Sequence, residues 1–196
     1  MIVFGLTQFL DRPLNFSAAY ALTFCCGVYL PRKLAWWLPL VTLAAVDCIE
    51  NWHRGDPFYA DQFFLYGAFA LIIWLGTRFR PDASWTRLLA GGLLGALVFY
   101  LVTNTASWYV NPFGSPEYTK DFRGWFTALT KGISGFPATW TFFRNTMLSG
   151  GLFTGLFVGA MKLSESLAAI EEPEPSPDRA REEDAEKPEP EPEPSA

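Results

Sequence analysis

The feature that most constrains this chain is a series of apolar segments separated by prolines and charged residues. Cutting the sequence at these breaks leaves five segments, at residues 16–30, 34–50, 60–79, 85–109 and 139–163. A bilayer core about 30 Å thick takes roughly 20 helical residues to cross. The last three segments reach that length comfortably and the first two only marginally, so we expect the shorter helices to tilt or to thin the bilayer.

The fold class that follows is an all-α integral membrane bundle of five or six transmembrane helices. A soluble bundle of buried helices would lack the polar faces needed to cover this much apolar surface. The number of helices depends on residues 1–10, which are apolar but too short to span and end at Asp11, Arg12 and Pro13. They are either a truncated first helix or a half-helix packed in the bundle, and they lack the charged start and cleavage site of a signal peptide.

Charge divides the chain into two predicted domains. Residues 1–164 carry 12 basic and 8 acidic residues, whereas residues 165–196 carry 3 basic and 12 acidic residues with EPEP repeats. The second part holds too little apolar surface to fold, so we predict a transmembrane domain at 1–164 and a disordered, acidic, Pro-rich tail at 165–196. The basic residues of the first part are scattered, which argues against a nucleic-acid partner.

The loop charges predict an orientation. Arg32, Lys33, Arg78, Arg80 and Arg87 punctuate two of the turns between segments and Lys162 follows the last segment, whereas the other loops are mixed in charge. The positive-inside rule therefore places these turns and the C-terminal tail in the cytoplasm and the long loop at 109–138 outside.

The aromatic residues fit this orientation. Seven of the eight tryptophans are expected at the two membrane boundaries, and Trp74 alone is expected inside a span. Within the long loop, apolar residues recur at helical spacing from Phe122 to Ile133. They predict a helix that either lies along the outer surface of the membrane or is an ordinary loop helix.

Small residues at intervals of four indicate close helix packing. They are Gly91 with Gly95, and Gly151, Gly155 and Gly159. In a bilayer such residues let helix backbones approach one another, within one chain or between subunits.

Polar residues at similar depth predict a site near the outer end of the bundle. They are Asp47, Thr103, Asn104, Ser107, Arg144 and Asn145. Charges at such depth usually face a partner or a water-filled cavity, and Asp47 with Arg144 is the natural ion pair. Two interpretations stay open: the residues tie helices together, or they line an outward-facing pocket walled by Trp108, Phe142 and Phe143.

Catalytic and metal chemistry find little support in the sequence. There is a single histidine, His53, and the three cysteines, Cys25, Cys26 and Cys48, lie in apolar segments without a metal-ligand spacing. We therefore expect no enzyme, no cofactor and no bound metal.

Several short motifs carry a resemblance over roughly residues 15–160. They are Asn15-Phe16-Ser17, Asp47, Thr103-Asn104 with Trp108, the FFRNT run at 142–146 and the LFT run at 152–154. In order and spacing, these motifs are similar to those of a family of uncharacterised bacterial integral membrane proteins. Members of that family resemble the S components of energy-coupling factor transporters, which capture vitamins from outside the cell.

This resemblance implies a location, a site and partners. The location would be the bacterial inner membrane, and the capture site would be lined by Asn15, Asp47, Asn104, Ser107, Trp108, Arg144 and Asn145. The partners would be the lipid bilayer, a small-molecule solute, and energising ATPase and transmembrane coupling subunits. The leading hypothesis is therefore an S-component-like transport subunit, and the rival is a non-transporting structural or protein-interaction protein.

Overall fold

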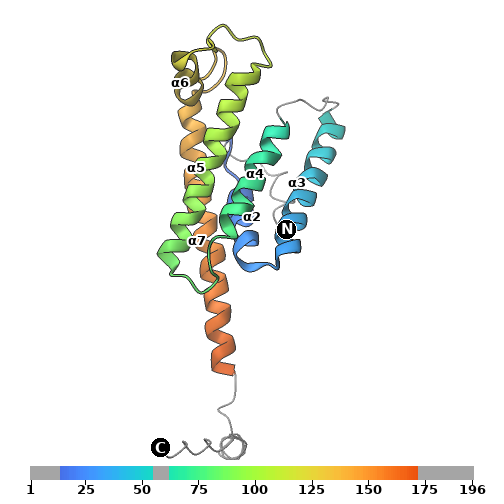
Figure 1. Cartoon of the computed structure of the whole chain (residues 1–196), viewed down its shortest axis with the longest axis vertical. Helices are drawn as coiled ribbons and strands as arrows, with labels where there is room; N and C mark the ends of the chain where they lie inside the picture. Colours follow the sequence, from blue (N-terminus) through green and yellow to red (C-terminus); the bar gives the residue numbers. More distant parts are fainter. Residues whose placement is uncertain (1–13, 55–61, 172–196) are drawn as a thin grey trace, which may run out of the picture. The chain divides into compact units, whose positions relative to one another are not determined.

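The computed structural model describes residues 14–54 and 62–171, and every regular element within these ranges is an α-helix. Residues 1–10, the predicted short first helix, lie outside the described residues. The helices shown in Figure 1 are α2 (Ala19–Tyr29), α3 (Arg32–Arg54), α4 (Gln62–Gly76), α5 (Trp85–Val110), α6 (Phe122–Thr130) and α7 (Thr139–Glu171). All five predicted apolar segments therefore contain a helix, which confirms the all-α fold.

The core forms around α2, which packs against α3, α4 and α5. Most residues of this helix are buried, and Ala21 and Phe24 are fully buried. The ring of Tyr20 lies 4.6 Å from that of Phe99 on α5, and Phe99 in turn lies 5.0 Å from Phe69 on α4. This aromatic cluster joins three helices, because each ring fills space that a smaller side chain would leave open.

Helices α2 and α4 cross at a pair of glycines that the sequence analysis did not single out. A Cβ atom added at Gly27 would lie 2.5 Å from the carbonyl oxygen of Ile73 and 2.9 Å from the Cα of Gly76. A Cβ added at Gly76 would lie 2.4 Å from the carbonyl oxygen of Phe24. The two backbones are thus in direct contact, which only glycine permits at these positions.

The predicted glycine series have mixed surroundings. A Cβ at Gly91 would lie 2.5 Å from the ring of Phe24, and those at Gly95 and Gly151 would lie 3.3 and 3.2 Å from side chains of neighbouring helices. One at Gly155 would have its nearest neighbour 3.7 Å away, and one at Gly159 would meet nothing within 4 Å. These glycines therefore face side chains or open space, while the tightest contact between α5 and α7 is at Gly92, where a Cβ would lie 2.2 Å from Thr154 Oγ1.

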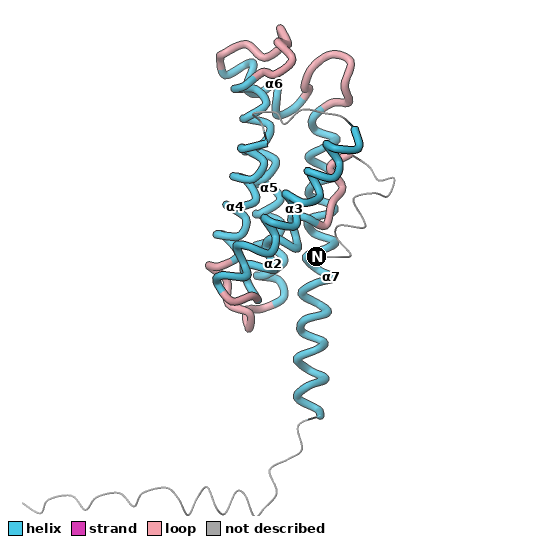
Figure 2. Tube along the Cα trace, turned by 90° about the vertical axis from the view of Figure 1, so that its right-hand side faces the viewer, coloured by secondary structure: helices cyan, strands magenta, loops and turns pink. Residues whose placement is uncertain are grey.

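Helix α6 confirms the predicted helix in the long loop. It begins at Phe122, packs against α5, and leaves Phe122 and Phe126 exposed while Gly124 and Ala128 are buried. Lys120 Nζ donates hydrogen bonds to the carbonyl oxygens of Trp108 and Tyr109, 2.7 and 2.6 Å away. It thereby caps the C-terminal end of α5. Figure 2 shows α6 near that end of the bundle.

Among the described residues, two helices are long and apolar enough to cross a membrane, namely α5 and the 139–170 part of α7. Helices α2 and α4 have 11 and 15 residues, and α4 is shorter than its predicted segment because the chain turns after Gly76. Helix α3 has 23 residues but begins with Arg32 and Lys33 and carries Pro39 and Asp47. The expected five or six spans therefore stay a prediction.

The chain divides into two compact units, Met1–Gly159 and Ala160–Ala196. In the second unit, α7 continues through residues 165–171, which had been assigned to the disordered tail. The segment from Leu167 to Ile170 consists of good helix formers such as alanine and leucine, which explains this continuation. The rest of the predicted tail, residues 172–196, lies outside the described residues.

Candidate functional site

Arg144 and Asn145 lie in the second turn of α7, close to the segment that precedes α2. Asn145 is buried, and its Nδ2 donates a hydrogen bond to the carbonyl oxygen of Leu14, 2.9 Å away. Its Oδ1 is 3.4 Å from both Nε and Nη2 of Arg144, whose guanidinium carbon lies 5.6 Å from the centre of the Trp140 ring. Asn145 and Trp140 thus orient an exposed guanidinium group.

Asn15 belongs to the same group of residues, because it follows Leu14 in the chain. Its backbone is in the left-handed region, with φ of 59°, and its carbonyl oxygen accepts a hydrogen bond of 3.2 Å from the hydroxyl of Tyr20. Asparagine tolerates this conformation better than most residues. The structure therefore brings Asn15, Arg144 and Asn145 together at one place.

Asp47 does not form the predicted ion pair with Arg144. Its Oδ2 accepts a hydrogen bond of 2.6 Å from the hydroxyl of Tyr66 on the adjacent helix α4. In the described ranges the ion pair observed is that of Arg80 with Asp82, at the opposite end of α4. The ion-pair prediction was wrong because Tyr66 supplies a donor to the carboxylate, while Arg144 is held by its chain neighbour Asn145.

Asn104, Ser107 and Trp108 form a third group, on the last three turns of α5. Asn104 Nδ2 donates to the carbonyl oxygen of Tyr100 in its own helix, 2.8 Å away, and the carbonyl oxygen of Ser107 accepts the N–H of Asn111. Trp108 Nε1 donates to the carbonyl oxygen of Thr119, 2.7 Å away. Trp108 also lines an apolar groove of about 380 Å³ with Phe64, Leu101, Val102, Thr105, Ala106 and Tyr109.

The predicted site residues thus form their hydrogen bonds in three groups, and the ring of Phe143, next to Arg144, lies 5.0 Å from that of Tyr100, whose carbonyl oxygen accepts from Asn104. In Arg144, the two contacts to one amide oxygen leave other donors of the guanidinium group available. The arrangement can bind an anionic or carbonyl group at Arg144. Among the described residues, no cluster of three or more His, Cys, Asp or Glu side chains is placed to hold a metal ion.

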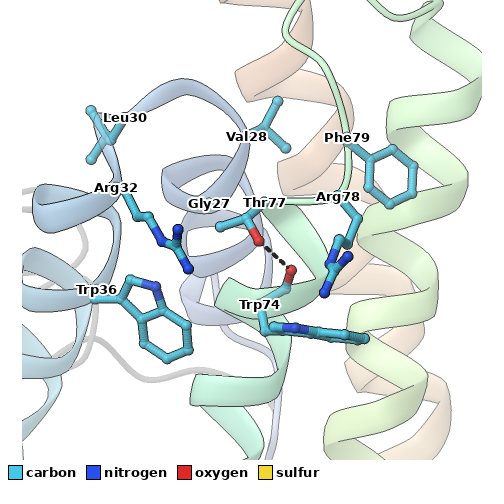
Figure 3. Close-up of a pocket in the computed structure, with 9 residues that line it drawn as sticks. All are labelled: Gly27, Val28, Leu30, Arg32, Trp36, Trp74, Thr77, Arg78 and Phe79. Atoms are coloured by element: carbon cyan, nitrogen blue, oxygen red, sulfur yellow. Dashed lines mark hydrogen bonds between the residues drawn. The ribbon is translucent and has the colours of Figure 1, made fainter.

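A second concave site lies at the opposite end of the bundle and was not recognised from the sequence. It has a volume of about 480 Å³ and is lined by Gly27, Val28, Leu30, Arg32, Trp36, Trp74, Thr77, Arg78 and Phe79. Figure 3 shows Arg32 and Arg78 on opposite sides of this cavity, which we call the arginine pocket. Trp74, expected inside a span, lies in the last turn of α4 and lines it.

The sequence carries a pattern at each side of the arginine pocket. Arg32 precedes Trp36 by four residues, and Trp74 precedes Arg78 by four. That spacing puts an arginine and a tryptophan on one helix face, and each pair occurs at the end of an apolar segment. Because these residues served only to assign the orientation, their meeting across α2 was missed.

Comparison with known proteins shows the family of the chain. Residues 1–173 match a protein family described as a family of unknown function (DUF6580). Neither a curated protein nor a protein of solved structure matches the chain.

Proposed function

Because this chain belongs to DUF6580, a family of unknown function, we propose a function for it from its own residues. It is a multi-pass protein of the bacterial inner membrane that binds a small solute at the Arg144 end of the bundle and performs no catalysis. The proposal has three parts, which are the membrane location, the binding site and the partners.

The membrane location is supported by the exposed faces of the two long helices. On α7, Leu148, Leu152 and Leu156 follow one another at intervals of four residues and are 59%, 51% and 59% exposed. Leu94 and Leu101 are likewise exposed on α5. A row of exposed leucines on a helix long enough to cross a bilayer is what a lipid-facing surface requires, whereas water would penalise it.

Solute binding is supported by the charge of Arg144 and by the residues that contact it. It is the predicted site residue whose charge has no acidic partner among the described residues, and Asn145 and Trp140 hold it in place. An arginine fork that is already oriented binds a carboxylate or a carbonyl group at low entropic cost. This is the observation that carries the proposal, and Asn15 beside Asn145 supplies a further polar edge.

The resemblance to S components suggests the partners of such a site. A capture subunit has no energy source of its own, so an ATPase and a transmembrane coupling subunit would drive release of the solute to the cytoplasm. In this orientation the acidic C-terminal tail is cytoplasmic, on the side where an ATPase would assemble.

The second candidate function is that of a structural or protein-interaction membrane protein. It is favoured by the hydrogen bonds of Asp47 to Tyr66, of Asn104 to its own helix and of Trp108 to the loop. Each of these side chains joins two parts of the fold or a helix to itself. If Arg144 has the same role, the bundle has no solute site at this end.

Replacement of Arg144 separates the two candidates. The full chain is purified in mild detergent, and native mass spectrometry identifies any small molecule that stays bound. We expect Arg144→Ala to lose the bound molecule while circular dichroism and thermal unfolding stay those of the unchanged protein. Arg123→Ala is the matched control, because Arg123 is an exposed arginine of nearby helix α6.

Two outcomes would count against solute binding. The first is an unchanged protein that carries no small molecule and no ATPase partner across several expression conditions. The second is a parallel loss of folding and binding in Arg144→Ala, which would assign Arg144 to the structure.

A further inference from the structure

The arginine pocket holds two positive charges, and among the described residues no acidic side chain lines it or forms an ion pair with them. Arg32 begins α3 and Arg78 follows α4, and their guanidinium groups reach the cavity from its two sides (Figure 3). The nearest acid in the sequence, Asp82, makes two hydrogen bonds of 3.1 Å with Arg80, outside the pocket. The pocket therefore retains a net positive charge.

Helix ends of both signs lie at the pocket, because α2 also ends here, at Tyr29 next to the lining residue Leu30. The N-terminus of α3 lies at the pocket through Arg32, and the first N–H groups of a helix carry partial positive charge. The C-terminus of α4 also lies there, but its last carbonyl oxygens are occupied. Those of Ile73, Leu75 and Gly76 accept backbone N–H groups, and that of Trp74 accepts the hydroxyl of Thr77 at 2.7 Å.

Trp74 orients Arg78, and Trp36 adds an apolar wall to the pocket. The guanidinium carbon of Arg78 lies 4.6 Å from the centre of the Trp74 ring, and Trp36 lines the pocket one turn after Arg32. Stacking on a tryptophan ring and the planar shape of the guanidinium group preorganise an arginine to bind an anion with several oxygen atoms. Phosphate fits this description, because each guanidinium can make two parallel hydrogen bonds to it.

Exposed apolar side chains lie next to the pocket. They include Trp37 of α3, which follows the lining residue Trp36, and Leu71 of α4, one turn before Trp74. A free phosphate ion would gain nothing from these side chains, whereas the acyl chains of a lipid would cover them. Tryptophans at a helix end mark the depth at which lipid headgroups lie.

We propose that the arginine pocket binds the phosphate group of an anionic phospholipid, with the acyl chains lying along the exposed sides of α3 and α4. Basic pockets between membrane helices are a known setting for such headgroups. The site is separate from Arg144, so this inference does not depend on solute capture. A bound lipid would connect the start of α3 to the end of α4.

The test measures lipid retention by the full chain in mild detergent. Phosphatidylglycerol or phosphatidylcholine is added, and native mass spectrometry counts the lipids that stay bound. We expect the unchanged protein to retain phosphatidylglycerol preferentially. The double variant Arg32→Gln/Arg78→Gln should weaken this retention by at least about tenfold, because each charged hydrogen bond lost accounts for about a tenfold change in affinity.

Two further samples make the result specific. Arg80→Gln removes a positive charge from the same turn but outside the pocket, so it should retain phosphatidylglycerol as before. Inorganic phosphate at millimolar concentration should displace little lipid, because it lacks the acyl chains.

Several results would overturn the proposal. They are equal retention of the two lipids by the unchanged protein, equal losses in Arg80→Gln and in the double variant, and displacement of the lipid by inorganic phosphate alone. If the double variant does not fold, the comparison of the two lipids on the unchanged protein decides.

Discussion

At the scale of single residues, two helices come into close contact at glycines where an added Cβ atom would clash with the neighbouring helix. Gly27 and Gly76 meet backbone atoms of the opposite helix, which cannot rotate away as a side chain can. Gly92 meets the buried side chain of Thr154, and Gly159 meets nothing within 4 Å. Glycines that look equivalent in the sequence therefore differ widely in what they contribute to stability.

Replacement of Gly27 tests this difference. Gly27→Ala should lower the free energy of unfolding by about 1–3 kcal/mol, because α2 and α4 must move apart to accommodate the methyl group. Gly159→Ala is the control and should be neutral or stabilising by up to about 1 kcal/mol, since alanine favours the helix. Thermal unfolding in detergent, followed by circular dichroism, measures both, and equal stability of the two variants would contradict the close crossing.

The same glycines show which helix contacts could be predicted from the sequence and which could not. The GxxxG spacing drew attention to Gly91, Gly95 and the series from Gly151, because their intervals are regular. Gly27 and Gly76 are isolated in the sequence and become a pair only when α2 and α4 pack. The partner of Asp47 was missed for a similar reason, since Tyr66 has no feature that distinguishes it from other aromatic residues of its segment.

At the scale of elements, helix boundaries follow from local chemistry that the sequence shows well. Ser84 and Asp121 cap α5 and α6, and both helices begin within one residue of the predicted position. Helix α7 ends later than the charge boundary at residue 165 predicts, because the residues that follow this boundary favour helix. Composition changes and helix ends need not coincide.

The cap of α6 gives a prediction about pH. The N–H of Gly124 and the hydroxyl of Thr119 donate hydrogen bonds of 2.8 and 2.7 Å to Asp121 Oδ1. These bonds hold the pKa of Asp121 below its usual range. A carboxylate whose pKa is lowered in the folded state stabilises at higher pH and loses that contribution as the pH falls through the lowered value.

We therefore expect the amides at the start of α6 to lose protection from hydrogen exchange in acid. Asp121→Asn is the control, because asparagine caps a helix without titrating. Comparing the two proteins at each pH cancels the intrinsic pH dependence of exchange. A parallel loss of protection in both proteins would show that the Asp121 carboxylate is not responsible.

At the scale of the whole molecule, charge distinguishes the two ends of the bundle. The turn before α3 and the turn after α4 meet at the arginine pocket, as their common assignment to one membrane side requires. The opposite end carries α6, whose exposed Phe122 and Phe126 are stacked with ring centres 6.3 Å apart. The sequence predicted that these ends differ, but it could not show that Arg32 and Arg78 share one cavity, since that depends on how α2 packs.

Cysteine labelling tests the proposed orientation in a membrane. Cys25 and Cys26 are buried, whereas Cys48 is exposed and is first replaced by serine. In intact bacterial cells, a membrane-impermeant maleimide should then label Ser134→Cys, in the loop after α6, and should not label Lys33→Cys, beside the arginine pocket. The reason is that cytoplasmic loops carry the excess of lysine and arginine. Both thiols should react once the membrane is permeabilised, which controls for accessibility.

Labelling of Lys33→Cys in intact cells would reverse the orientation. The arginine pocket would then lie in the outer leaflet. Arg144 would lie on the cytoplasmic side, where it could not capture a solute from outside.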